Sequence, residues 1–172
     1  MNSKATPPRP LSGTIRPTDE QARALARDLI SDARFASLGV LDNGAPMVTR
    51  VAMGTTPSGE PLTLISDISN HTRALKINPV CSLLVGEPGP KGDPLTHPRL
   101  TLQCRVKFVP HSDPGYKAHA DHYLATHPKA KLYIGFADFS FAIFGVITAY
   151  LNGGFGKAYN LGPGDLKQQG AP

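Results

Sequence analysis

The chain has 172 residues, of which 40% are hydrophobic and 18% charged, and its formal net charge is +5. These values are typical of one soluble globular domain with its own core, and they exclude a disordered chain. The basic residues form no run interleaved with aromatic residues, so nothing supports a nucleic-acid partner. No apolar stretch approaches the roughly 20 residues that a membrane-spanning helix requires, and the N-terminus lacks an apolar secretory core. We therefore expect a cytoplasmic protein with no nucleic-acid partner and no membrane partner.

Residues 1–17 are rich in proline and polar groups, which predicts a flexible N-terminal arm without helix or strand. The segment 18–21 (Thr-Asp-Glu-Gln) then matches a capping box. Apolar residues follow on one helical face, at Ala22, Leu25, Leu29 and Ala33. A helix is therefore predicted directly after the arm.

A series of strands follows this helix. The runs 35–41 and 46–56 are joined by Asp-Asn-Gly at 42–44, a sequence typical of a tight hairpin turn. The run 99–109 alternates apolar and polar residues, as a half-buried strand does. Further strands are predicted at 62–66, 80–85, 131–134 and 139–152. A short helix that ends at Asn78-Pro79 and a longer one between Asp113-Pro114 and His127-Pro128 complete the prediction.

These elements predict a mainly β protein with three helices at the margins of an antiparallel sheet, because strands and helices do not alternate regularly. A small closed or split barrel is favoured, since closure removes exposed strand edges. Cys81 and Cys104 each lie in a strand-like run and are interpreted as buried thiols. We expect the barrel domain over 18–160 and a mobile C-terminal tail over 161–172.

The segment 66–73 joins an apolar strand to the start of the short helix. Such a junction leaves backbone N–H groups unpaired, with the positive end of the helix dipole behind them. Hydroxyls from Ser66, Ser69 and Thr72 and the guanidinium of Arg73 are expected to converge there. This is the chemistry of a pocket for one phosphate or other small anion. A helix that is merely capped at its start, with Arg73 in solvent, is the alternative.

Two other features allow a functional interpretation. His119, His122 and His127 lie on or near one predicted helix, but the absence of nearby cysteine partners argues against a metal site. A haem ligand from this group remains an alternative. The glycine-rich segment 153–157 lacks the strand-to-helix context of a dinucleotide-binding loop and is interpreted as a turn, with an anion contact by Lys157 as the alternative.

Seven short stretches occur in a recognisable order. They are 49–53 (TRVAM), 64–67 (LISD), 71–75 (HTRAL), 78–85 (NPVCSLLV), 97–103 (HPRLTLQ), 123–128 (YLATHP) and 153–158 (GGFGKA). In their order and spacing the first four resemble the FMN-binding split-barrel family of pyridoxamine 5'-phosphate oxidase. The last three are similar to the haem-utilisation or haem-degrading branch of that family. The resemblance runs from about residue 18 to residue 158.

The resemblance implies a homodimer of six-stranded antiparallel split β-barrels of the FMN-binding type, with a flavin in each of two clefts at the subunit interface. The strand facing the flavin ring and its ribityl chain corresponds to Arg50, Val51, Ala52 and Met53. The phosphate-binding junction corresponds to Ser66, Asp67, Ser69, His71, Thr72 and Arg73. Arg99 of the partner subunit would reach the ring. Guanidinium, hydroxyl and helix N–H groups bind phosphate by their own chemistry, which agrees with this assignment.

The function implied is that of an FMN-dependent oxidoreductase of unknown substrate, in which no catalytic acid or base can be identified. A true pyridoxamine 5'-phosphate oxidase is not expected, because the chain has no tryptophan and no Arg-x-His-type tail. The chain stops at Pro172, before the additional C-terminal domain of many haem-degrading members, so the split barrel can be present without haem-oxygenase activity. A haem-binding or haem-utilisation protein that uses the same dimeric barrel is the alternative function. A barrel that has lost its cofactor is the third.

Overall fold

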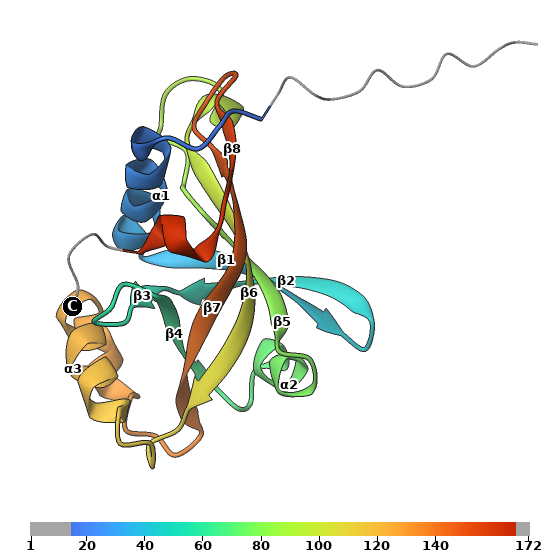
Figure 1. The fold of residues 1–172 in the computed structure, drawn as a ribbon. Coiled ribbons are helices and arrows are strands. Elements are labelled where there is room, and N and C mark those ends of the chain that lie inside the picture. The colour runs from blue at the N-terminus through green and yellow to red at the C-terminus, as the bar shows by residue number, and fades with distance from the viewer. Residues whose placement is uncertain (1–14, 168–172) are drawn as a thin grey trace, which may run out of the picture.

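The computed structural model describes residues 15–167, which form one sheet with helices at its margins (Figure 1). The strands are β1 (Phe35–Asp42), β2 (Ala45–Ala52), β3 (Gly54–Thr55), β4 (Pro61–Ser66), β5 (Val80–Val85), β6 (Arg99–Val109), β7 (Phe139–Asn152) and β8 (Ala158–Leu161). The helices are α1 (Glu20–Asp32), α2 (Asn70–Ile77) and α3 (Tyr116–Thr126), with the short 3-10 helices η1 (Pro94–Thr96), η2 (Pro128–Leu132) and η3 (Pro163–Leu166). Among these described residues no helix is both long and apolar enough to cross a membrane.

The strands are hydrogen-bonded in the order β2-β1-β5-β6-β7-β4-β3, and β8 pairs with β7. The sheet curls, so that β2 at one end of this order approaches β4, the strand before the other end. The Thr63 hydroxyl on β4 donates to the Ala52 carbonyl on β2 at 2.5 Å. β2 and β4 are thus neighbours in space but not in the strand order, and the curled sheet stays open between them. The predicted split barrel is confirmed, although the sheet has eight strands rather than six.

The β1–β2 hairpin is the local structure that the sequence predicts most directly. All eight residues of β1 pair with β2, from Phe35 opposite Ala52 to Asp42 opposite Ala45. The two turn residues have positive φ, +49° at Asn43 and +83° at Gly44. A turn with positive φ at both positions matches the right-handed twist of the strands, and Asn-Gly adopts it at little cost. Figure 1 shows this hairpin extending away from α1 and α3.

Helix α1 begins one residue later than the predicted capping box, in which Thr18 would be the N-cap; the Thr18 hydroxyl donates to the Asn160 carbonyl instead. The carboxylate of Asp19, the N-cap residue, accepts a hydrogen bond from the Ala22 amide at 2.8 Å. The buried face of α1 is Ala22, Ala26 and Ile30, and the helix packs against the larger part of the core. The predicted positions Leu25 and Leu29 lie beside this face and are only partly buried.

The core has two parts. The larger fills the barrel, where Leu100, Leu102 and Cys104 of β6 are fully buried. The smaller lies under α3 and includes the buried rings of Tyr123 and Phe141. The predicted burial of both cysteines is confirmed: Cys81 and Cys104 are free, buried and directly opposite each other across β5 and β6. Burial raises the pKa of the Cys81 thiol to about 12.

Two predicted strands need correction. The strand predicted at 131–134 is wrong: the chain turns through η2, and the amides of Tyr133 and Ile134 both donate to the Ala130 carbonyl. The strand predicted at 46–56 is interrupted at Met53, whose amide donates to the Arg34 carbonyl instead of to a strand partner. The Met53 side chain enters the core at this interruption, and only residues 54–55 resume pairing.

The ends of the domain differ from the expected boundaries. Of the predicted arm, residues 1–14 lie outside the described residues, whereas Ile15 forms a bridge with Ala158. Of the predicted tail, residues 162–167 follow β8, and Asp165 pairs with Arg23 of α1 at 2.7 Å. Residues 168–172 lie outside the described part of the chain. The mobility expected of both ends stays a prediction.

Candidate functional site

A cavity of about 300 Å³ lies along the opening of the barrel, between β2, β4 and the start of α2. Its lining residues are Arg50, Val51, Ala52, Leu64, Ile65, Ser66, Ser69, His71, Tyr133 and Phe139. Six of the predicted cofactor-binding residues are therefore brought together: Arg50, Val51, Ala52, Ser66, Ser69 and His71. The volume is at the lower end of the range for small-molecule pockets.

The β2 side of the cavity carries its positive charge. The guanidinium carbon of Arg50 lies 5.0 Å from the ring centroid of Phe35, a cation–π contact that orients an otherwise exposed side chain. After Arg50 only two residues of β2 remain. β2 is the first strand of the order and pairs with β1 alone, so its other edge has no strand partner among the described residues. Val51 and Ala52 therefore face the cavity on the side where a second strand would otherwise pair.

The start of α2 forms the anion-binding end of the cavity. Ser69 is the N-cap residue, and its hydroxyl makes no capping hydrogen bond, so it is free to contact a ligand. Its carbonyl accepts from the amides of Thr72 and Arg73 at 3.1 and 3.2 Å. The first turn of α2 contains no acidic residue that would oppose an anion. A free hydroxyl at the positive end of a helix dipole is a suitable site for a phosphate or carboxylate.

His71 has one ring nitrogen engaged and one buried without a partner. Its Nδ1 lies 3.3 Å from the Thr49 hydroxyl, whereas its Nε2 has no hydrogen-bond partner among the described residues. Burial lowers the pKa of His71, so the neutral imidazole is favoured near neutral pH. An unsatisfied buried nitrogen is costly, and a ligand or a small movement of the ring would relieve that cost.

Ser66 is held by a carboxylate. Its hydroxyl donates to Asp138 Oδ2 at 2.5 Å and accepts from the Ile68 amide at 3.2 Å. Because a hydroxyl has one hydrogen and two lone pairs, and the Ile68 amide uses one of these, Ser66 can offer one lone pair but no donor to the cavity in this arrangement. The sequence predicts a phosphate donor here, and the structure gives an acceptor instead.

The remaining predicted residues do not line the cavity. Met53 and Thr72 are fully buried in the structure, and the Thr72 hydroxyl has no partner among residues 15–167. Asp67 pairs with Lys76 at 2.7 Å and faces a different cavity. Arg73 is exposed and donates to the side chain of Asn70. Their roles in binding stay predictions.

Arg99 also lies outside the cavity of its own chain. Its guanidinium donates to the carbonyls of Leu95 and His97 at 2.9 and 3.4 Å. The prediction concerned Arg99 of the partner subunit, and it remains a prediction.

Four lining residues of the cavity were not predicted: Leu64, Ile65, Tyr133 and Phe139. Leu64 and Ile65 come directly before Ser66, so their position on the strand was a usable signal. Tyr133 had none, because residues 131–134 were expected to form a strand, and Phe139 was predicted as the first residue of a strand but not as a lining residue. Tyr133 directly follows η2, so its position depends on that turn, whereas Phe139 lies opposite Ser66 in the sheet.

The three histidines near α3 do not converge. His122 Nε2 lies 3.4 Å from the Thr55 hydroxyl, and His127 Nε2 lies 3.2 Å from the Arg34 carbonyl. His119 contacts the edge of Phe141 instead. Within residues 15–167 no group of three or more His, Cys, Asp or Glu side chains could hold a metal ion.

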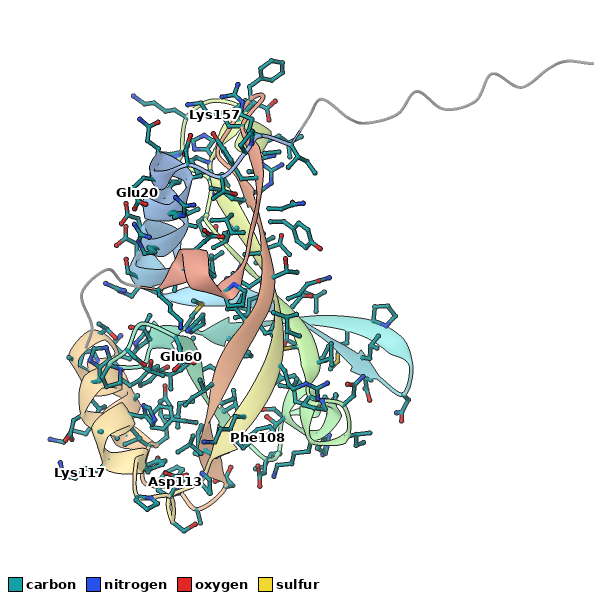
Figure 2. All side chains as sticks on the ribbon, in the orientation of Figure 1. Glu20, Glu60, Phe108, Asp113, Lys117 and Lys157 are labelled. Carbon is teal, nitrogen blue, oxygen red and sulfur yellow. The ribbon has the colours of Figure 1, made fainter. Side chains whose placement is uncertain are left out.

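The segment 153–157 forms the turn between β7 and β8. The Gly153 amide donates to the Lys157 carbonyl at 2.7 Å, and Gly154 and Gly156 both have positive φ. Figure 2 shows Lys157 at one end of the molecule and Phe108 and Asp113 toward the other. The interpretation as a turn is confirmed, and an anion contact by Lys157 stays untested.

Comparisons with known proteins give the chain a family. Residues 17–167 match the model of the family described as "CREG, beta-barrel". A protein of Arabidopsis thaliana, the chloroplastic non-canonical heme oxygenase HOZ, is 34% identical over 122 residues, which are 64% of this chain and 36% of that protein. This chain thus spans little more than a third of that relative's length.

Solved structures agree with the fold. A heme binding protein from Mycobacterium smegmatis has 28% identity and a TM-score of 0.75, with 88% of this chain and 61% of that chain covered. A pyridoxinephosphate oxidase family protein related to general stress protein 26, from Clostridium acetobutylicum, has 14% identity and a TM-score of 0.64, with 87% and 99% covered. At this low identity the second similarity supports the fold alone. The chain therefore belongs to the CREG β-barrel family, within the split-barrel proteins that resemble pyridoxamine 5'-phosphate oxidase.

Proposed function

We propose that this protein binds FMN in the β2–β4 cavity and acts as a flavin-dependent oxidoreductase on a small-molecule substrate that is still unknown. The observation that supports this most strongly is the convergence of Arg50, the free Ser69 hydroxyl and the start of α2 on one cavity. When bound, FMN supplies the redox chemistry, and the protein binds and orients it.

The two ends of the cavity suit different parts of FMN. Ser69 and the start of α2 offer donors and a positive dipole end, which suit a phosphate. Ser66 offers only a lone pair, which suits a hydroxyl donor such as those of the ribityl chain. Leu64, Tyr133 and Phe139 provide apolar and aromatic surface for a ring system. The residues present therefore fit this cofactor.

A homodimer is part of this proposal. Exposed apolar side chains occur on the outer face of the sheet, among them Val48, Leu84 and Tyr150, which are 70%, 43% and 44% exposed. Leu84 and Tyr150 belong to one cross-strand row, because both pair with Thr101. An exposed apolar patch of this kind supports a protein–protein interface.

The cross-strand row that contains Leu84 and Tyr150 extends to Arg50, which lines the cavity. Arg50 lies opposite Ser37, and Ser37 lies opposite Leu84, so Arg50 and Leu84 share a face of the sheet. Arg99 is also on this face, since it is two residues before Thr101 on β6. A second copy seated on the patch would lie beside Arg50, which supports a ligand site close to the interface.

The dimer is tested by light scattering after size-exclusion chromatography. We expect the wild-type mass to be that of two chains and Leu84→Glu to reduce it to that of one. Leu132→Glu is the control, because Leu132 is 79% exposed on η2, outside the sheet. A monomeric wild type would contradict this part of the proposal.

Haem binding is the second candidate, and the names of two relatives favour it. The Arabidopsis relative is a heme oxygenase and the mycobacterial one a heme binding protein. The carboxylates of haem would use the same donors at Arg50 and α2. His71, neutral and with one unpartnered ring nitrogen, is of the type that ligates haem iron.

One experiment separates the two candidates. Purified wild-type protein and Arg50→Ala are titrated in parallel with FMN and with haemin, and any ligand that co-purifies is identified by mass spectrometry. Quenching of flavin fluorescence that Arg50→Ala weakens supports the FMN proposal. A Soret band that is lost in His71→Ala, without flavin binding, favours haem. Protein that binds neither ligand contradicts both.

A further inference from the structure

A second cavity, of about 540 Å³, lies on the other side of the junction between β4 and α2. It is formed around Phe108, His111, Asp138 and Phe139, with Asp67 and Lys76 at its α2 side. Phe139 lines both cavities, and the hydrogen bond from Ser66 to Asp138 connects them. Phe108 marks the region of the second cavity in Figure 2.

The charges that line this cavity do not cancel. Asp67 and Lys76 form an ion pair at 2.7 Å and neutralise each other. Asp138 has no cationic partner among the described residues, and the Ser66 hydroxyl satisfies only one of its oxygens. A carboxylate has about four lone-pair sites, so Asp138 retains most of its capacity to accept hydrogen bonds.

His111 adds a second acceptor. Its Nε2 lies 2.9 Å from the Ile134 carbonyl, and since a carbonyl can only accept, this nitrogen carries a hydrogen. In the neutral ring the remaining nitrogen, Nδ1, is therefore an acceptor. The ring also packs against the Tyr116 ring in a tilted arrangement, with centroids 4.3 Å apart and an interplanar angle of 35°, which holds it in place.

Part of the wall is aromatic, beside small and polar residues such as Ser112 and Ser140. Phe108 and Phe139 line the cavity, and the ammonium of Lys76 already lies 5.9 Å from the Phe108 centroid. This contact shows that the Phe108 ring can receive a cation in this geometry. Aromatic walls around one uncompensated carboxylate select a ligand with an apolar body and a positive charge.

From this we infer that the second cavity binds a small organic cation, an amine or amidine attached to an aromatic or apolar group. Its charged group would donate to Asp138, and its body would lie against Phe108 and Phe139. The inference does not depend on which cofactor occupies the β2–β4 cavity.

The test uses three probes of similar shape and different charge on the full-length protein. Benzylamine, benzyl alcohol and benzoate are titrated against the isotope-labelled chain, and binding is followed by amide chemical shifts and by saturation transfer to the probe. We expect benzylamine to shift amides around Phe108 and Asp138, with benzyl alcohol about tenfold weaker and benzoate without effect. Equal binding of the three probes, or no binding of benzylamine at millimolar concentration, would overturn the inference.

Two substitutions at the cavity have opposite expected effects. Asp138→Asn keeps an acceptor for Ser66 but removes the charge, and we expect it to weaken benzylamine about tenfold or more. Lys76→Gln removes the cation that neutralises Asp67, and we expect it to tighten benzylamine about two- to fivefold.

Asp121→Asn is the matched control, because Asp121 is an exposed carboxylate on α3 that pairs with Lys117. It should leave benzylamine affinity unchanged. An equal loss in Asp138→Asn and Asp121→Asn would mean that only net charge matters, and weaker binding in Lys76→Gln would contradict the charge balance described above.

Discussion

The two cavities beside the β4–α2 junction share a wall but present opposite chemistry. The β2–β4 cavity has Arg50, a free Ser69 hydroxyl and the positive end of α2. The second cavity has the uncompensated carboxylate of Asp138 between aromatic side chains. One hydrogen bond, from Ser66 to Asp138, connects them, and its direction makes Ser66 an acceptor. The comparison shows that neighbouring residues of one loop can serve different sites, so proximity in sequence alone does not assign a residue to a ligand.

The largest expected effect concerns the structural support of the shared wall. Phe141 is fully buried, pairs with Leu64 across the sheet, and packs against Tyr116 and Tyr123 at 5.2 and 5.5 Å between centroids. Phe141→Ala should lower the free energy of unfolding by about 3–5 kcal/mol, the usual cost of removing a buried ring. Denaturant unfolding followed by circular dichroism measures this.

Phe139→Ala is the comparison for that experiment, because Phe139 lines both cavities and is only partly buried. Phe139→Ala should lower the free energy of unfolding clearly less than Phe141→Ala does. Equal losses would show that the wall is not supported by the buried ring as described.

The next effect distinguishes two arginines. Arg50→Ala should weaken FMN binding by about 1.5–3 kcal/mol, the range for a hydrogen bond to a charged group. The sequence alone favours Arg73 for this role, but Arg73 is exposed and bonded to Asn70, so Arg73→Ala should cost no more than about 1 kcal/mol. Fluorescence titration with FMN gives both values. If Arg73→Ala weakened FMN binding more than Arg50→Ala did, the phosphate would be bound at Arg73, as the sequence predicts.

A third prediction separates the two serines. Ser69→Ala should weaken FMN binding by about 1 kcal/mol. It should not change the binding of riboflavin, which lacks the phosphate. Protein stability should hardly change, because the Ser69 side chain makes no capping bond. The two ligands are titrated against the same protein preparation.

Ser66→Ala provides the contrast, since Ser66 offers an acceptor and not a donor. It should affect FMN and riboflavin alike. If Ser66→Ala were the substitution that removed the preference for FMN over riboflavin, the phosphate would lie at Ser66.

The smallest expected effect is a pH dependence from His71. Burial lowers the pKa of His71 in the folded state, whereas in the unfolded chain this pKa has its ordinary value of about 6.5. Between these two values the unfolded chain binds a proton that the folded chain does not, so the free energy of unfolding falls as the pH is lowered through this window. Above the window the contribution is constant.

His71→Gln should flatten this part of the stability profile, measured by denaturant unfolding at a series of pH values. His122→Gln, on the exposed side of α3, is the control and should leave the profile unchanged. A profile that is equally steep in wild type and His71→Gln would mean that His71 is not the titrating group.

Much of the fold could be predicted from local signals. The capping residue Asp19 and the Asn43-Gly44 turn act through their own backbone geometry, so the sequence defines α1 and the β1–β2 hairpin without knowledge of the rest. The segment 131–134 could not be predicted in this way. Its apolar residues resemble a strand, but the turn at η2 depends on packing under α3.

The candidate site was predictable in part for the same reason. Ser69 follows from the helix start, which is a local feature, whereas Arg50 was assigned through the family resemblance. The pairing of Ser66 with Asp138 joins residues that are 72 positions apart, and the sequence contains no sign of it. Met53 was assigned to the ligand through the family resemblance, but β2 ends before it and its side chain is buried in the core.

The most direct test of the central claim is a crystal structure of the protein grown with FMN. We predict that the flavin lies between β2 and β4, with its phosphate at Ser69 and the start of α2 and Arg50 beside it. FMN bound at any other place, or crystals in which Tyr133 and Phe139 close this cavity at saturating FMN, would contradict the account.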